Sequence, residues 1–551
     1  MMSRVLENLQ GLLHFFDALK LNSTSSMLMS RVLENLEWAQ GLVRSYRPVH
    51  LKFSASSMLF RVVKNLQGPE LWLSLFLFFI FKLYFKQRNK PVWSWPLLKS
   101  VPSVLANSHR LHDWLSGLLA AGGGTLMFYV PAMQAVVTSD PRNIEFILKS
   151  NFENFPKGKE FSKVFSKLMG SGIFNSDAES WKVQRKIANV HIHSKLFRQF
   201  MARTTQDIVE TQLIPILKRC AQSPSPIDLQ DILLRFTFDA TCTAVFGENP
   251  RCLSPDLPSV PFAEAINEAM EAIVFKYVLP ASWWRTLRWL NLWKARKFSE
   301  AIVVIDEFVA RQIKLRKEEE VRGGDLLSIY AEKSDEVTFL RDTAVNFLIA
   351  GRDTSGTALS WFFWNLANHP HVEAKILEEL REVLREKTRE SLKPDDLDKL
   401  VYLHAALSES LRLYPSVPIG QKGVIKEATL PSGTVVKPGM VIFYLIYAVG
   451  RMEWVWGKDC MEFKPERWID ENGKLRHENN SYRFLAFNGG PRTCIGKDVA
   501  FVQMKFAAAL VLLNFEVRVV EGHPVAPLTS VILNMKRGLM VTVKERTKVE
   551  G

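Results

Sequence analysis

Cysteine is scarce in this chain of 551 residues, and its scarcity limits the kinds of site that the chain can build. The five cysteines are widely and irregularly spaced, and no two of them form a C-x-x-C pair. An odd, scattered set argues against a disulfide framework and against a structural zinc site, and it is typical of a reducing compartment. The five are Cys220, Cys242, Cys252, Cys460 and Cys494.

The chain also lacks a linker that would divide it, although its length alone would suggest roughly three or four domains. Hydrophobic residues make up 47% of it, which is enough for a large core. The formal net charge is +14, but the basic residues form no Arg-rich run and no nucleic-acid motif. The charge therefore favours a membrane surface or an acidic protein partner over nucleic acid.

The N-terminal part has its own organisation. Residues 1–68 contain a short repeat whose third, diverged copy begins at Met58, and we interpret them as a recent duplication or as a start site placed too early, with a transit peptide as the weaker alternative. Residues 69–86 are predicted to form a membrane anchor rather than a buried core helix, because the run at 71–85 is almost entirely aromatic and aliphatic, Lys82 within it can snorkel, and basic residues follow it. A basic, proline-containing hinge at 87–98 and a catalytic domain at 99–551 complete the expected organisation.

The rest of the chain predicts a mainly α fold with a small β portion. Alternating residues at 126–130 and 134–138 predict a hairpin, and Asp140-Pro141 predicts the start of a helix. Helical periodicity then continues to about residue 410. Four tryptophans interleaved with basic residues could form a membrane-contacting surface or belong to the core, and these alternatives stay open; they are Trp283, Trp284, Trp289 and Trp293.

One loop near the C-terminus carries the strongest chemical signal. It runs from Phe487 to Gly496 as F-N-G-G-P-R-T-C-I-G and leads into an apolar helical run. Its glycines would let the backbone pass close to a flat, bulky group, and Pro491 would forbid helix until the cysteine is presented. Cys494 would then precede a helix start, where backbone N–H groups favour a thiolate. The simpler alternative is a buried cysteine beside a helix cap.

The spacing F-x-x-G-x-R-x-C-x-G resembles the haem-binding signature of the cytochrome P-450 (haem-thiolate monooxygenase) superfamily. The resemblance implies the cytochrome P-450 fold with an N-terminal membrane-anchor helix, haem b (iron protoporphyrin IX) as cofactor, and Cys494 as the axial ligand of its iron. Phe487, Arg492 and Gly496 belong to the same signature. Trp181 and Arg185 form a W-x-x-x-R on a predicted helix, which is similar to the family's propionate-binding helix.

Three further motifs follow in the family's order. Ala350 to Ser355 lies inside a long apolar helical run, and its Gly, Asp and Thr predict a local break in that helix. Asp353 and Thr354 resemble the family's acid-alcohol pair, which would hold and relay protons during oxygen activation. Glu409-x-x-Arg412 and the later Arg467 resemble the family's buried Glu-Arg-Arg cluster, to which we assign a structural role.

Three stretches, residues 229–239, 350–364 and 535–539, are most similar to the plant clan that hydroxylates fatty acids and alkanes, in its alkane-hydroxylase branch. The resemblance implies a membrane-bound enzyme on the cytosolic side of the endoplasmic reticulum that inserts one oxygen atom from O2 into a C–H bond of a hydrophobic substrate. The expected pocket residues, placed by position relative to the motifs, are Phe161, Phe165, Ile173, Ala350, Val417, Ile419, Val531 and Leu533, and each could equally be plain core.

The sequence contains no flavin or dinucleotide fingerprint, so electrons would come from outside, from an NADPH-dependent flavoprotein reductase. Lys182, Lys186, Lys195 and Lys497 could dock an acidic reductase, or they could form an ordinary basic face. Two alternative functions remain: a haem-thiolate enzyme that couples or hydroxylates aromatic or alkaloid substrates, and a non-enzymatic haem-binding protein. The intact Asp353-Thr354 pair favours oxygen insertion.

Overall fold

The computed structural model describes Lys82, Val92 and residues 99–130, 133–223, 225–318, 324–384, 392–476 and 482–546. The chain separates into two units between Lys90 and Pro91, and the description below concerns the second. The extension predicted at 1–68, the anchor at 69–86 and the hinge at 87–98 lie outside the described residues, except for Lys82 and Val92. Within the part of the chain that is described, no helix has the length and apolar character needed to cross a bilayer.

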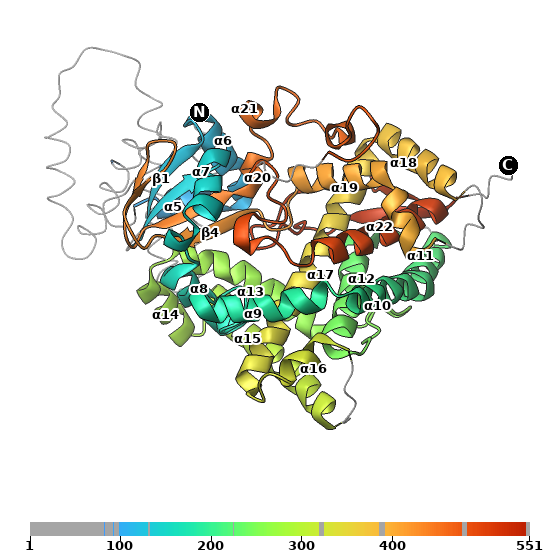
Figure 1. Cartoon of the computed structure of the whole chain (residues 1–551), viewed down its shortest axis with the longest axis horizontal. Coiled ribbons are helices and arrows are strands. Elements are labelled where there is room, and N and C mark those ends of the chain that lie inside the picture. The colour runs from blue at the N-terminus through green and yellow to red at the C-terminus, as the bar shows by residue number, and fades with distance from the viewer. Residues whose placement is uncertain are drawn as a thin grey trace, which may run out of the picture. The chain divides into compact units, whose positions relative to one another are not determined.

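Helices dominate the second unit, as predicted, with a small β portion (Figure 1). The α-helices are α5 (Val101–Ala106), α6 (Leu111–Ala121), α7 (Pro141–Glu145), α8 (Gly158–Met169), α9 (Ala178–Ile192), α10 (Lys195–Ile208), α11 (Ile214–Ala221), α12 (Leu229–Phe246), α13 (Pro261–Val278), α14 (Ala281–Trp289), α15 (Trp293–Glu318), α16 (Leu326–Ala331), α17 (Val337–Asn368), α18 (Pro370–Val383), α19 (Val401–Leu413), α20 (Ile446–Val449), α21 (Glu453–Trp456) and α22 (Lys497–Asn514). The strands are β1 (Thr125–Val130), β2 (Met133–Thr138), β3 (Ile227–Asp228), β4 (Ile419–Gly423), β5 (Ala428–Thr429), β6 (Val435–Val436), β7 (Val441–Leu445), β8 (Phe515–Val519) and β9 (Met540–Glu545).

The predicted hairpin begins the largest sheet. Strands β1 and β2 pair antiparallel, β2 runs parallel to β7, and β7 pairs antiparallel with β4, in the order β1-β2-β7-β4. The helix predicted after Asp140 is α7: the Asp140 carboxylate accepts the N–H of Arg142 at 2.9 Å, and Pro141 is the first helical residue. In the strand order given above, β4 lies at one edge of the sheet, where it packs against α8.

Helix α17 is continuous over Val337–Asn368, so the break predicted near residues 350–355 is wrong. Its glycines serve close packing against α12 instead. A Cβ on Gly351 would come within 2.5 Å of the Thr241 hydroxyl oxygen, and one on Gly356 would come within 2.8 Å of the Leu234 side chain. Small residues therefore let two helices touch along their backbones without interrupting either helix.

A hydroxyl also joins these two helices. The Thr237 side chain on α12 donates to the backbone carbonyl of Arg352 on α17 at 2.7 Å. Helix α17 packs against α12, α15, α19 and α22 and lies centrally in the unit (Figure 1). The position of residues 350–357 is consequently fixed by α12 as well as by their own helix.

Candidate functional site

The loop that presents Cys494 contains a short 3₁₀ turn, η7 (Gly490–Arg492), and leads into α22. Pro491 lies inside this three-residue turn, and the α-helix begins only at Lys497, after the cysteine, as predicted. The N–H of Cys494 donates to the carbonyl of Phe487 at 2.8 Å, and this bond closes the loop.

The three glycines of the loop are needed for different structural reasons. Gly490 has a φ of +64°, and a Cβ there would meet the carbonyl oxygen of Leu148 at 1.9 Å. A Cβ on Gly489 would lie 2.6 Å from the Tyr482 ring. Both glycines are therefore required by the protein's own contacts, whatever else lies beside the loop. At Gly496, by contrast, a Cβ would meet no protein atom within 4 Å, so this is the glycine that leaves open space beside the cysteine.

Cys494 combines an accessible side chain with dense surroundings. Its accessible surface classes it as exposed, yet it is enclosed closely enough that burial raises the pKa of its thiol. The N–H of Gly496 and the charges of Arg185 and Lys497 lower this pKa, but burial outweighs them. The prediction that the chain alone favours the thiolate is therefore wrong. A metal cation on the sulfur would supply the missing stabilisation of the thiolate.

Arg492 and Trp181 come together as neighbours. The guanidinium carbon of Arg492 lies 4.4 Å from the centre of the Trp181 ring, and its NH2 donates to the carbonyl of Ser176 at 2.8 Å and to the Asp177 carboxylate at 2.7 Å. Asp177 also accepts the backbone N–H of Lys157 at 2.9 Å. These contacts orient the Arg492 side chain, and its Nε is buried with no partner among the described residues.

Sequence reasoning missed two lysines in the same place. Lys422 on β4 is fully buried, and within the described part of the chain its Nζ has no hydrogen-bond partner. Burial, followed by the charges of Lys157 and Arg492, lowers the pKa of Lys422 to about 6. Burial and Arg492 likewise lower the pKa of Lys157 to about 7. Asp177 is the acid whose charge raises the pKa of all three basic groups. One acid against three basic groups leaves the cluster short of negative charge, which fits a ligand with more than one carboxylate.

No spacing pattern marks Lys157. For Lys422 the one sign in the sequence is a lysine placed between Gly420 and Gly423, a short distance after the E-x-x-R helix. A pocket lies beside this cluster, and it is lined by Phe152, Glu153, Pro156, Asp177, Ala178, Trp181, Lys182 and Arg492.

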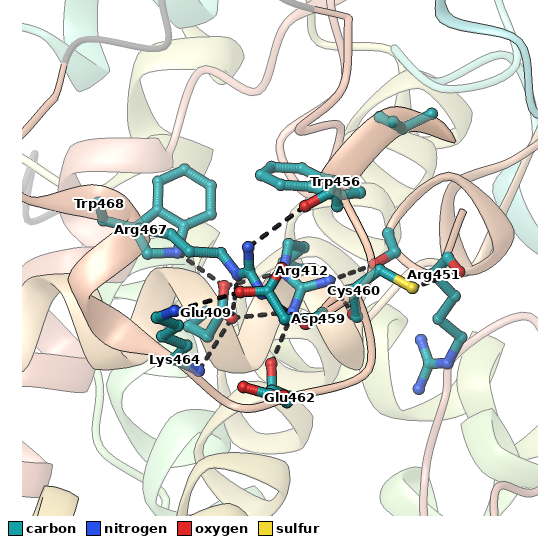
Figure 2. A network of polar contacts seen from close by, with 12 residues as sticks. Glu409, Arg412, Arg451, Trp456, Asp459, Cys460, Glu462, Lys464, Arg467 and Trp468 are labelled. Atoms are coloured by element: carbon teal, nitrogen blue, oxygen red, sulfur yellow. Dashed lines mark hydrogen bonds and ion pairs between the residues drawn. The ribbon is translucent and has the colours of Figure 1, made fainter. Parts of the chain in front are cut away.

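Glu409, Arg412 and Arg467 form one polar cluster (Figure 2). The side chains of Glu409 and Arg412 are fully buried and joined by two hydrogen bonds of 2.8 Å, and Arg467 Nε donates to Glu409 at 3.2 Å. The Trp468 indole and the N–H of Lys464 also donate to Glu409, at 2.9 and 3.0 Å. Every oxygen lone pair of this carboxylate thus faces a donor.

Asp353 and Thr354 have separate partners on α17. The Asp353 carboxylate is buried and pairs with Arg352 through one oxygen, while its Oδ2 has no partner among the described residues. Burial raises the pKa of Asp353 and Arg352 opposes this rise. The Thr354 hydroxyl donates to the carbonyl of Ala350 at 2.6 Å, which leaves its oxygen free to accept.

Comparison with known proteins decides the family. The family model for cytochrome P450 matches residues 90–543. The chain belongs to the cytochrome P450 family. It is similar to cytochrome P450 86B1 of Arabidopsis thaliana, with 42% identity over 87% of this chain and 90% of the relative. Alkane hydroxylase MAH1 of the same plant is 39% identical over 85% and 97% of the two chains. Noroxomaritidine synthase 2 of Narcissus pseudonarcissus is 36% identical over 87% and 97%.

This chain is therefore a P450 monooxygenase, and the family's cofactor is haem b. The residues present fit that cofactor. Cys494 is accessible, and its sulfur, as a thiolate, would be a soft ligand suited to iron. The unpartnered Nζ of Lys422 and Nε of Arg492 offer donors for the two haem propionates, for which the cluster lacks acids of its own. The relatives also agree with the plant hydroxylase branch that the sequence resembles.

The residues expected to line the substrate pocket of this P450 do not all lie together. Phe161 and Phe165 on α8 stack with ring centres 4.3 Å apart, and they belong to one apolar cluster with Ile173 and Val531. Ala350, Val417 and Ile419 are half-buried. Leu533 presents no accessible surface, and its backbone bonds to Ser416 and to the Trp361 indole hold it in the core.

Proposed function

We propose that this P450 inserts one oxygen atom from O2 into a C–H bond of a long-chain alkane or fatty acid. The observation that carries the proposal is the similarity to an alkane hydroxylase over 97% of that protein's length. The apolar cluster around Phe161, Phe165, Ile173 and Val531 supports it, because an aliphatic chain binds among such side chains without leaving polar groups unpaired.

The proposal gives each site residue a role. Cys494 would bind the haem iron, with Phe487 and Gly496 beside it. Trp181, Arg185 and Arg492 would hold the propionates, and we add Lys157 and Lys422 to this set, because their buried ammonium groups need an anion. When bound, haem supplies the activation of O2 and the oxidation of the C–H bond. Glu409, Arg412 and Arg467 would support the cysteine loop structurally.

Protons would pass through α17. Asp353 can hold a proton because burial raises its pKa, and its unpartnered Oδ2 can accept or release one. Thr354 can accept a hydrogen bond while its own hydrogen is held by the carbonyl of Ala350. The pair could therefore deliver protons without admitting bulk water.

A flavoprotein reductase that uses NADPH would supply the electrons. Lys182, Lys186, Lys195 and Lys497, on α9, α10 and α22, are all exposed. Exposed apolar side chains accompany them on the same helices: Val183, Val190 and Leu196. Basic and apolar residues in this combination suit an acidic partner that docks near the cysteine loop.

The membrane would be that of the endoplasmic reticulum, with the catalytic domain on its cytosolic side. Support comes from the junction of α14 and α15, where Trp289 is 83% exposed and Trp283 is 50% exposed. Leu290, Leu292 and Trp293 are exposed beside them, as are Arg285 and Arg288. Tryptophan next to arginine is typical of side chains at a membrane interface. Trp284, in contrast, is buried against Phe298. We therefore assign Trp284 to the core and the exposed tryptophans to the membrane surface.

The test combines a spectrum with turnover. We expect the reduced, CO-treated protein to show the Soret shift of a thiolate-bound haem. With reductase and NADPH, it should convert an alkane or a fatty acid to an alcohol. A normal CO spectrum with no NADPH-dependent product from alkanes, fatty acids or phenolics would contradict oxygen insertion.

A second function is favoured by one observation, the 36% identity to noroxomaritidine synthase 2. We propose, as this second function, that the same site oxidises aromatic or alkaloid substrates. The same assay separates the two: product from a phenolic alkaloid precursor, with none from aliphatic chains, would favour this second function.

A further inference from the structure

A polar pair lies within an apolar part of the molecule. The hydroxyl of Tyr277, near the end of α13, donates to Oε1 of Gln421 on β4. Gln421 is only 5% exposed, and its Nε2 has no partner among the described residues. The two residues come from segments 144 positions apart, so the fold, not local sequence, brings them together.

The surroundings of the pair are aromatic. The Tyr277 ring meets Phe165 edge-on at 6.1 Å and Phe443 at 5.9 Å between ring centres. Phe443 is also the residue paired with Gln421 across the sheet. Burial raises the pKa of the Tyr277 hydroxyl, which therefore stays protonated.

An amide left unpaired in such a place is costly. A buried donor without an acceptor costs about 1–3 kcal/mol, and most buried polar groups in proteins are satisfied. The Gln421 amide oxygen accepts from Tyr277, whereas its NH2 group has no acceptor among the described residues. A ligand oxygen could supply that acceptor.

The strand itself separates two kinds of contact. Side chains alternate between the faces of a strand, so Ile419 and Gln421 share one face of β4 and Lys422 lies on the other. Lys422 belongs to the cation cluster with Arg492, whereas Ile419 is an expected pocket residue. Helix α8, which carries the stacked Phe161 and Phe165, packs against both β4 and α13. Gln421 is thus on the face of the strand that carries Ile419, an expected pocket residue, and that meets Tyr277.

We propose that Gln421 and Tyr277 bind an oxygen atom at the end of an aliphatic substrate, remote from the carbon that is oxidised. The inference rests on the proposed function and narrows its substrate class to chains with a terminal oxygen, in preference to plain alkanes. A hydroxyl fits best, since it can accept from the amide N–H or donate to the amide oxygen whichever way the amide is turned. The ammonium of Lys276, the preceding residue, already donates to the carbonyls of Lys163 and Val164, so the pair itself is neutral.

The test uses the full-length holoenzyme and three ligands of equal carbon number: an alkane, its primary alcohol and its carboxylic acid. Binding is followed by the change in the haem absorption spectrum. We expect the alcohol to bind about 10-fold more tightly than the alkane, the difference that one satisfied hydrogen bond makes. Gln421→Leu should remove this preference and leave the alkane affinity within about twofold, and Tyr277→Phe should reduce the preference about threefold.

The matched control is Tyr330→Phe. It removes another buried tyrosine hydroxyl from the same apolar cluster, one that donates to the carbonyl of Gln184 at 3.2 Å, and it should change no preference. Equal binding of alkane and alcohol by the unmodified enzyme overturns the inference, as does an equal loss of both in Gln421→Leu. A preference for the acid alone would also overturn it, by requiring a cation that the pair lacks. If no aliphatic ligand binds while the CO spectrum is normal, the aliphatic substrate class itself is wrong, and the inference falls with it.

Discussion

Replacing Glu409 with alanine tests how the buried cluster supports the cysteine loop. Glu409 accepts five hydrogen bonds, of 2.8 to 3.2 Å, and neither its side chain nor that of Arg412 is exposed. Removing the carboxylate leaves the Arg412 guanidinium with carbonyl acceptors but without a counter-charge. Breaking a buried ion pair from one side costs about 3–5 kcal/mol. That is a large share of the roughly 5–15 kcal/mol by which a domain is stable.

The assay is urea denaturation of the holoenzyme, followed by far-ultraviolet circular dichroism and by the CO difference spectrum. We expect the unfolding midpoint to fall and the haem to be lost at lower urea than in the unmodified protein. Glu409→Gln keeps the shape of the side chain and one acceptor oxygen, so its unfolding midpoint should lie between those of Glu409→Ala and the unmodified protein.

Glu466→Ala is the matched control. Its ion pair with Lys375 is about half exposed on both sides, and such pairs contribute about 0–1 kcal/mol. If Glu409→Ala loses no more stability than Glu466→Ala, and keeps its haem, the reasoning about the buried charge is refuted.

Three further predictions concern the cofactor, the proton route and the membrane. Haem binding should take up protons above about pH 6, because propionates restore the charge of Lys422 and Lys157, whose pKa values without them are about 6 and 7. Haem affinity should therefore weaken as pH rises, and Lys422→Met should flatten that dependence in haem titrations of the apoprotein. Thr354→Ala should increase peroxide release relative to product, as measured by NADPH, peroxide and product together, and unchanged coupling would rule out its role as a proton relay. In a chain lacking residues 1–90, Trp283→Ser should weaken binding to anionic vesicles about 10-fold, whereas Trp454→Ser, with 51% exposure against 50%, should not.

Local chemistry could be predicted from the sequence where it depends on neighbours along the chain. The hairpin, the Asp140 cap and the pairing of Glu409 with Arg412 all follow from short spacings, and the structure has them. Arg467 is distant in the sequence from Glu409, and it could be predicted as a third member of this cluster because of the resemblance to the family motif.

Features that depend on another element could not be predicted. Gly351 suggested a break because helix propensity describes an isolated helix, whereas its neighbour is Thr241 on α12. Lys422 gains its meaning from Lys157 and Arg492, which approach it from other segments. The thiol pKa of Cys494 was expected to fall because the helix start was considered without the burial that opposes it.

The contact between Gly490 and Leu148 has a consequence for how the enzyme is made. The loop that carries the cysteine is seated on the backbone of a segment more than three hundred residues earlier, and the cysteine is residue 494 of 551. During synthesis, the cations at 157 and 422 leave the ribosome well before the sulfur does. The ribosome must therefore have made every segment from residue 148 to residue 494 before a complete cofactor site can exist. Haem loading then follows the synthesis of the cysteine loop, the last of these segments along the chain.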